Sequence, residues 1–142
     1  MRRFWLVGFT VLLADQLSKL LVFRSLLGKT VGLPGLLTLH YVRNSGAAFG
    51  FFGNWTPFLI VLSLVLVTLV FAGYNRIKAA PVYWQWGIGL LLGGAVGNLI
   101  DRLRFGYVID FIDIGFWPVF NLADTAIVCG VAVIACGVLR EK

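Results

Sequence analysis

Residues 57–74 read PFLIVLSLVLVTLVFAGY, a run without a charged side chain whose interior holds nothing more polar than Ser63 and Thr68. A helix needs about 20 apolar residues to cross the hydrocarbon layer of a bilayer, which is about 30 Å thick. The run approaches that length. It therefore predicts a transmembrane helix.

The rest of the chain has the same character. Of its 142 residues 60% are hydrophobic and only 13% are charged, and the mean hydropathy is +0.94. A soluble domain of this length would need a far more polar surface. We predict an all-α integral membrane protein that forms a single membrane domain over residues 1–142. Its four transmembrane helices are expected at about 4–23, 57–74, 82–102 and 119–139.

The start of the chain raises the alternative of a secretory signal peptide, because Arg2 and Arg3 precede an apolar stretch. Asp15 and Lys19 interrupt that stretch, however, and no small-residue cleavage site follows it. We therefore expect a retained first transmembrane helix.

The net charge of +6 could indicate a nucleic-acid partner, but the basic residues are scattered rather than gathered in a stripe. We expect no such partner and interpret these residues as topology signals. Short segments on one side of the predicted helices carry Arg2, Arg3, Arg76, Lys78, Arg140 and Lys142. Much longer loops on the other side carry Arg24, Lys29, Arg43, Arg102 and Arg104. Counted per loop length the first side is more basic, which places both termini in the cytoplasm.

The loop over about 25–56 falls on the outer side and contains LLTLHYV, which is rich in β-branched and aromatic residues. With glycine and proline on both sides, this pattern predicts a small hairpin or sheet. The aromatic residues near its end are expected among the lipid headgroups. They are Phe49, Phe51, Phe52 and Trp55.

The third predicted helix has a smooth face. Gly89, Gly93 and Gly97 give two overlapping GxxxG spacings. Small residues let helix backbones approach closely, so we interpret this face as a packing surface. Cys129 and Cys136 are likewise interpreted as small packing residues. A single histidine, His40, and no Cys or His cluster argue against a zinc site.

Five aspartates gather near one membrane face in this arrangement: Asp15, Asp101, Asp110, Asp113 and Asp124. Ionisable residues at membrane depth usually face a bundle interior or a wet cavity. The structural alternative is ion pairing at helix ends, of Asp15 with Lys19 and of Asp101 with Arg102 or Arg104. That alternative fails for the last three aspartates, because no basic residue lies between Arg104 and Arg140.

Two neighbouring carboxyls in a low dielectric share one proton, because both cannot ionise cheaply. Such a pair can deprotonate a water for attack on a peptide carbonyl and protonate the departing amine. The serines lack a base and the cysteines lie deep in the last helix. An aspartyl hydrolase is therefore one reading, a proton- or cation-coupled transporter a second, and a structural or assembly protein a third.

Five blocks in this order resemble the bacterial lipoprotein signal peptidase family, also called signal peptidase II. They are DQLSK (Asp15–Lys19), RNSGAAFG (Arg43–Gly50), GGAVGNLIDRL (Gly93–Leu103), VIDFI (Val108–Ile112) and FNLADTAI (Phe120–Ile127). The resemblance implies four transmembrane helices with a periplasmic β-cradle between the first two. It implies an aspartyl endopeptidase of the bacterial inner membrane, with its site near the outer leaflet.

The resemblance also implies the substrate, a diacylglyceryl-modified prolipoprotein cut just before the lipidated cysteine. It implies no metal or organic cofactor, inhibition by globomycin, and contact with membrane lipids; we expect a monomer. Matched by motif, Asp110 and Asp124 are the catalytic pair. The substrate-binding or supporting positions are Asn44, Gly94, Asn98, Arg102, Asn121, Asp15 and Lys19. The segment between the two aspartates is shorter than the family pattern, and we expect Asp113 to be a solvated loop carboxylate.

Overall fold

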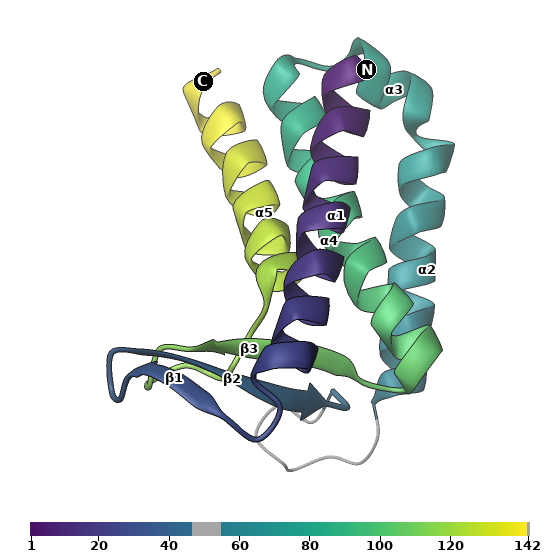
Figure 1. Ribbon diagram of the computed structural model, residues 1–142. Helices are drawn as coiled ribbons and strands as arrows, with labels where there is room; N and C mark the ends of the chain where they lie inside the picture. Colours follow the sequence, from purple (N-terminus) through teal and green to yellow (C-terminus); the bar gives the residue numbers. More distant parts are fainter. Residues whose placement is uncertain (47–54, 142) are drawn as a thin grey trace.

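The computed structural model describes residues 1–46 and 55–141, so the predicted headgroup positions of Phe49, Phe51 and Phe52 lie outside the described residues. The long helices of the described residues, α1, α2, α4 and α5, stand side by side, with both termini at one end and a small sheet across the other (Figure 1). The helices are α1 (Arg2–Ser25), α2 (Thr56–Ala72), the short α3 (Tyr74–Ala79), α4 (Val82–Phe105) and α5 (Leu122–Arg140). The strands are β1 (Thr30–Leu33), β2 (Leu37–Asn44) and β3 (Val108–Asp113).

Helix α4 is the centre of the bundle and contacts α1, α2 and α5. Its glycines make these contacts close. A Cβ on Gly89 would lie 2.9 Å from the carbonyl oxygen of Phe4 in α1, and one on Gly94 would collide with the carbonyl oxygen of Ala123 in α5. The predicted packing role of the glycine face is thus confirmed. Because three helices surround it, α4 can also carry polar residues that a lipid-exposed helix could not.

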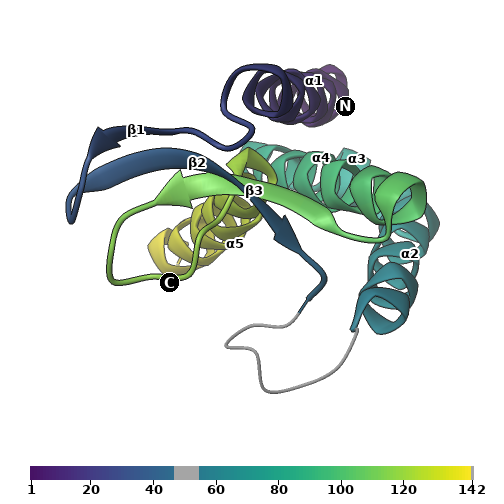
Figure 2. The ribbon, with the colours of Figure 1, turned by 60° about the horizontal axis from the view of Figure 1, so that its bottom comes forward.

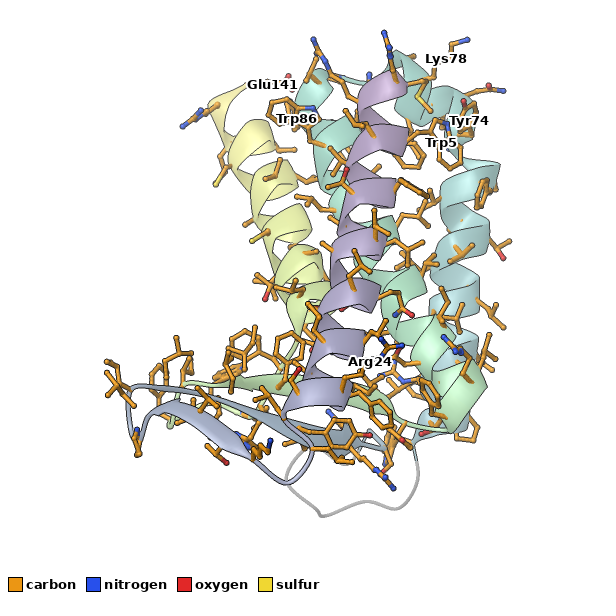
Figure 3. All side chains as sticks on the ribbon, viewed as in Figure 1. Trp5, Arg24, Tyr74, Lys78, Trp86 and Glu141 are labelled. Carbon is orange, nitrogen blue, oxygen red and sulfur yellow. The ribbon has the colours of Figure 1, made fainter. Side chains whose placement is uncertain are left out.

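Within the described ranges, α1 and α5 are both long and apolar enough to cross a membrane, and α2 is apolar but shorter. The outward faces of these three helices expose large apolar side chains, among them Leu6, Phe9, Leu21, Phe58, Val61, Leu69, Val128 and Val131. Continuous apolar surface of this extent suits contact with lipid rather than water. The end that holds the termini carries Trp5, Tyr74, Lys78, Trp86 and Glu141, whereas Arg24 lies near the sheet (Figure 3).

The sheet has the order β1-β2-β3 with both pairs antiparallel. Strands β1 and β2 form the hairpin predicted for the loop after the first helix. The third strand is a correction, because residues 103–118 lie between the helices predicted at 82–102 and 119–139, and Asp113 among them was expected in a loop. Figure 2 turns this end of the molecule toward the viewer and shows β3 crossing in front of α4 and α5. Burial explains the strand, since Val108, Ile109 and Phe111 all lose contact with solvent there.

Several helix boundaries also differ from the predicted ones. Helix α4 continues to Phe105 and stops at Gly106, whose left-handed φ of 78° favours glycine. Helix α5 begins at Leu122 rather than at 119, because Phe120 instead pairs with Ile112 of β3. The short helix α3 was not predicted; it carries the basic Arg76 and Lys78 between α2 and α4.

Among residues 1–46 and 55–141, the buried apolar side chains form two clusters. The first cluster lies toward the end with the termini and consists of Phe4, Val70, Ile77 and Leu92. The second lies where α1 meets β3 and consists of Val22, Ile109 and Phe111. Buried polar side chains collect toward the sheet end: Asp15, Lys19, Asn98, Asp101, Asp110 and Asn121. Burying so many polar groups is costly unless each one is paired. Their partners define the candidate site.

Candidate active site

Asp110 lies in the middle of β3 with its side chain almost completely buried at 1% exposure. Its two carboxyl oxygens accept hydrogen bonds from the side-chain amides of Asn44, at 2.7 Å, and Asn121, at 2.6 Å. The backbone N–H of Gly46 donates to Oδ1 of Asn44 at 2.8 Å. That bond fixes the Asn44 amide so that its NH₂ faces Asp110.

Asp124 lies in the first turn of α5, where it forms a capping box with Asn121. The Asp124 N–H donates to Oδ1 of Asn121 at 2.9 Å, and the Asn121 N–H donates to Oδ2 of Asp124 at 3.3 Å. The amide of Asn98 donates to the other oxygen, Oδ1, at 2.8 Å. Each oxygen of this carboxyl therefore faces an N–H donor at the start of the helix.

The segment between the two aspartates closes on itself through backbone bonds. Ile112 and Phe120 exchange N–H to carbonyl hydrogen bonds of 2.8 and 3.0 Å. This bridge holds the residue after Phe120, Asn121, beside Asp110. Asn121 therefore contacts both carboxyls, through its side chain to Asp110 and through the capping box to Asp124.

The pKa of Asp110 is raised to about 6, mainly because burial removes the water that would solvate its charge. The hydrogen bond from Asn44 opposes this rise, the negative charge of Asp124 adds to it, and the amide of Asn121 and the charge of Lys19 also oppose it. Burial thus favours the protonated form of Asp110, although two amides donate to its oxygens. A protonated carboxyl beside a second carboxyl is what acid and base roles require.

Behind the pair lies a buried charge cluster built on Lys19. Its ammonium group is 2.8 Å from Asp15 Oδ2 and 2.9 Å from Asp101 Oδ2, and it donates to Oδ1 of Asn98 at 3.0 Å. The pairing of Asp15 with Lys19 agrees with the structural alternative from the sequence. The pairing of Asp101 with Arg102 or Arg104 was wrong, because Asp101 turns into the bundle toward α1.

The same two carboxylates also hold backbone groups of other elements. Asp15 Oδ1 accepts the N–H of Ala123 in α5 at 3.0 Å, and Asp101 Oδ2 accepts the N–H of Ile109 in β3 at 3.1 Å. Gln16, which the sequence did not single out, donates to Asp101 at 3.1 Å and to Asp15 at 3.2 Å. The cluster therefore fixes the two elements that carry the aspartate pair.

Arg102 is half-buried and interacts electrostatically with Asp124, Asp110 and Asp101. Its Nε is buried and, within residues 1–46 and 55–141, has no hydrogen-bond partner. A guanidinium beside the pair with an unused donor can bind an oxygen of a ligand. Gly94, by contrast, is buried at the contact between α4 and α5.

Asp113 differs from its prediction. It is the last residue of β3 and is half-buried, whereas we expected a solvated loop position. Its oxygens accept the N–H of Gly115 at 2.8 Å and the hydroxyl of Thr38 at 3.4 Å. The first bond closes the turn after β3, and the second links β3 to its neighbour β2. In the described ranges no three His, Cys, Asp or Glu side chains are grouped so that they could hold a metal ion.

A family model described as signal peptidase (SPase) II matches residues 7–140 of the chain. The chain belongs to the signal peptidase II family. The lipoprotein signal peptidase of Moorella thermoacetica is 43% identical over 134 residues, which cover 92% of this chain and 89% of that protein. The lipoprotein signal peptidase of Syntrophomonas wolfei is 48% identical over 131 residues, which cover 90% of this chain and 87% of that protein.

Two solved structures described as bacterial membrane enzymes share the fold of this signal peptidase II family member. One superposes with a TM-score of 0.83 at 30% identity, covering 96% of this chain and 87% of the other. The second gives 0.81 at 33% identity and covers 96% and 92%. Family membership makes the chain a protease, and the apolar helices and these neighbours make it an integral membrane protein. The transporter and assembly alternatives are thereby set aside.

Proposed function

We propose that the chain is an intramembrane aspartyl endopeptidase that removes signal peptides from diacylglyceryl-modified prolipoproteins, cutting before the lipidated cysteine. Asp110 and Asp124 are its catalytic pair. The observation that carries this proposal is the shared contact with Asn121, which joins a buried carboxyl on β3 to a carboxyl at the start of α5. The names of the curated relatives support a prolipoprotein substrate.

The two carboxyls take different roles because their surroundings differ. Ionised Asp124 accepts a proton from a water as the water oxygen bonds to the scissile carbonyl carbon, and Asp110 gives its proton to the carbonyl oxygen. In the second step the protonated Asp124 gives its proton to the amine as the carbon–nitrogen bond breaks. Asp110 regains its proton from the hydroxyl that becomes the new carboxyl. Each carboxyl ends in its starting state.

The remaining positions support this chemistry. The amides of Asn44, Asn98 and Asn121 orient the pair, and Arg102 holds a carbonyl or ester oxygen of the substrate with its planar fork. Asp15 and Lys19 anchor the elements that carry the pair, and Gly94 lets α5 approach α4. The resemblance implies no metal or organic cofactor.

The proposed setting is the bacterial cytoplasmic membrane, with α1, α2, α4 and α5 as four spanning helices of one domain over residues 1–142. Both termini lie in the cytoplasm, and the sheet forms a periplasmic β-cradle at the outer leaflet. In support, the termini share one end of the bundle and the sheet lies at the other (Figure 1). We expect the protein to act as a monomer among membrane lipids.

A cavity beside Asp124 supports recognition of a lipidated substrate. Its volume is about 390 Å³, and Phe116, Trp117, Phe120 and Val128 are among the mainly apolar residues that line it. An acyl chain entering sideways from the bilayer fits such a lining. Each buried CH₂ contributes about 0.8 kcal/mol, so two acyl chains supply a large part of the binding free energy.

The direct test is to incubate the purified protein with a diacylated prolipoprotein and to follow release of the signal peptide. We expect release, inhibition by globomycin, and far slower cleavage of the same precursor without lipid. Equal rates for the two precursors would refute lipid recognition. Absence of cleavage by a folded protein would refute the proposed function as a whole.

A further inference from the structure

Asn98 connects the charge cluster to the aspartate pair. Its Oδ1 accepts two hydrogen bonds, from the ammonium of Lys19 at 3.0 Å and from the amide of Asn121 at 3.1 Å, and its Nδ2 donates to Asp124 at 2.8 Å. A flipped amide would present its NH₂ to two donors and its oxygen to a carboxylate. Only one orientation of Asn98 satisfies all three neighbours.

The ammonium group of Lys19 is fully paired, and this holds its hydrogen bond to Asn98 in place. Its side chain is only 3% exposed, and its three N–H donors have three partners, namely Asp15, Asp101 and Asn98. The two carboxylates are themselves held by backbone N–H groups of α5 and β3. The ammonium is therefore fixed between α1 and α4, with its third donor aimed at Asn98 Oδ1.

The orientation of this amide bears on where the proton of the pair resides. An N–H donated to a carboxylate favours its ionised form, whereas an amide oxygen facing the same carboxyl favours the protonated form. The observed orientation therefore matches an ionised Asp124. Asp110 also accepts two amide N–H groups, but it is more deeply buried than Asp124, and burial disfavours a charge on it. The single proton that the two carboxyls share is therefore placed on Asp110.

We propose that Lys19 is a positioning residue that, through the amide of Asn98, makes Asp124 the ionised base and leaves the shared proton on Asp110. This inference rests on the proposed function and gives Lys19, already an anchor of the pair, a second task that it performs through Asn98. The charged groups around Asn98 come from four elements. They are Asp15 and Lys19 of α1, Asp101 and Arg102 of α4, Asp110 of β3 and Asp124 of α5.

The test compares the pH profile of kcat/KM for the diacylated substrate in three variants. The first replaces the whole ion cluster, as Asp15→Asn, Lys19→Met and Asp101→Asn together, so that no buried charge is left unpaired. The second, Asn98→Leu, keeps the ion cluster and removes the amide. The third, Gln16→Leu, is the matched control, because Gln16 bonds Asp15 and Asp101 but not Asn98.

We expect the first two variants to move the acidic limb of the profile to higher pH and to lower kcat/KM at the wild-type optimum by about tenfold or more. Combining them should produce no further shift of the limb, because both interrupt the same connection. Gln16→Leu should lower the melting temperature and leave the limb in place.

A cluster variant that loses the same fraction of activity at every pH, with an unmoved limb, would overturn the proposal and leave Lys19 a purely structural role. The proposal is also overturned if the acidic limb of the Asn98→Leu profile stays in place. Asn98→Leu therefore decides the test by itself if the cluster variant does not fold. Failure of the proposed function is separate, because the wild-type protein would then not release the signal peptide at all.

Discussion

Asn121 has two tasks in this site, and a single substitution can separate them. Its Oδ1 caps α5, and its Nδ2 donates to Asp110 at 2.6 Å. Asn121→Ala removes both contacts, and loss of a helix cap costs about 0.5–2 kcal/mol. Asn121→Ser keeps an oxygen for the cap but has no N–H group that reaches Asp110.

We expect both Asn121 variants to lose most cleavage activity, while only Asn121→Ala shows a clearly lower melting temperature. Cleavage of the lipidated precursor and thermal unfolding in detergent give the two readouts. A serine variant as active as the wild type would show that the amide contact to Asp110 is dispensable.

A prediction for the pH dependence of cleavage also follows from a single residue, Asp110. Its pKa is raised to about 6, so the protonated form that donates to the carbonyl oxygen prevails below that pH and is lost above it. We expect kcat/KM to decline as pH rises past about 6. The decline should be unchanged in Asp113→Asn, and a profile that is flat well above pH 6 would contradict the acid role of Asp110.

Strand β3 shows, at the scale of elements, what the sequence could not supply. Its residues VIDFID suit a strand, but the sequence pattern indicates only a connection between two predicted helices. The strand forms because its partner β2, far earlier in the chain, pairs with it antiparallel, with Val42 opposite Asp110. Such long-range pairing leaves no mark in local periodicity.

The candidate pair was easier to identify than its support. The lack of a basic residue nearby in sequence drew attention to Asp110, Asp113 and Asp124, and the resemblance to the family motifs assigned Asp110 and Asp124 as the pair. Asp101 has local arginines, so its actual partner Lys19, on a helix at the other end of the sequence, was missed. Gln16 was missed for the same reason, because an amide on an apolar helix has no distinctive spacing.

The contact between α4 and α5 can be tested at Gly94. A Cβ at this position collides with the carbonyl oxygen of Ala123, in the first turn of α5 that carries Asp124. We expect Gly94→Ala to lower both the melting temperature and cleavage. Val131→Ala, at a half-exposed position on the outer face of α5, is the control and should change neither much. Unaltered cleavage and stability in Gly94→Ala would mean that the two helices need not approach so closely.

At the scale of the whole molecule, the composition predicted insertion into a membrane. The structure agrees with that prediction, because α1, α2 and α5 present apolar faces outward. Helix α4 is different: its polar and glycine-rich sequence is acceptable only because its neighbours surround it. The predicted orientation of the protein in the membrane is based on the basic residues near the termini, and it can be measured directly.

We expect Lys29→Cys, in a background of Cys129→Ala and Cys136→Ala, to react with a membrane-impermeant thiol reagent in intact spheroplasts. Lys29 precedes β1 at the sheet end, whereas Lys78 lies on α3 at the opposite end. Lys78→Cys in the same background should react only after lysis. The reverse pattern would place the sheet in the cytoplasm and contradict the proposed topology.

The central claim is that Asp110 and Asp124 perform the cleavage, and separate Asp→Asn substitutions at the clustered aspartates test it most directly. Release of the signal peptide from a diacylated prolipoprotein is measured for each purified, folded variant. Asp110→Asn and Asp124→Asn should each abolish release, because each removes a titrating carboxyl of the pair. Asp113→Asn should retain most activity, since the bonds of Asp113 to Gly115 and Thr38 lie outside the aspartate pair. Normal release by Asp110→Asn or Asp124→Asn, or a folded but inactive Asp113→Asn, would contradict the account.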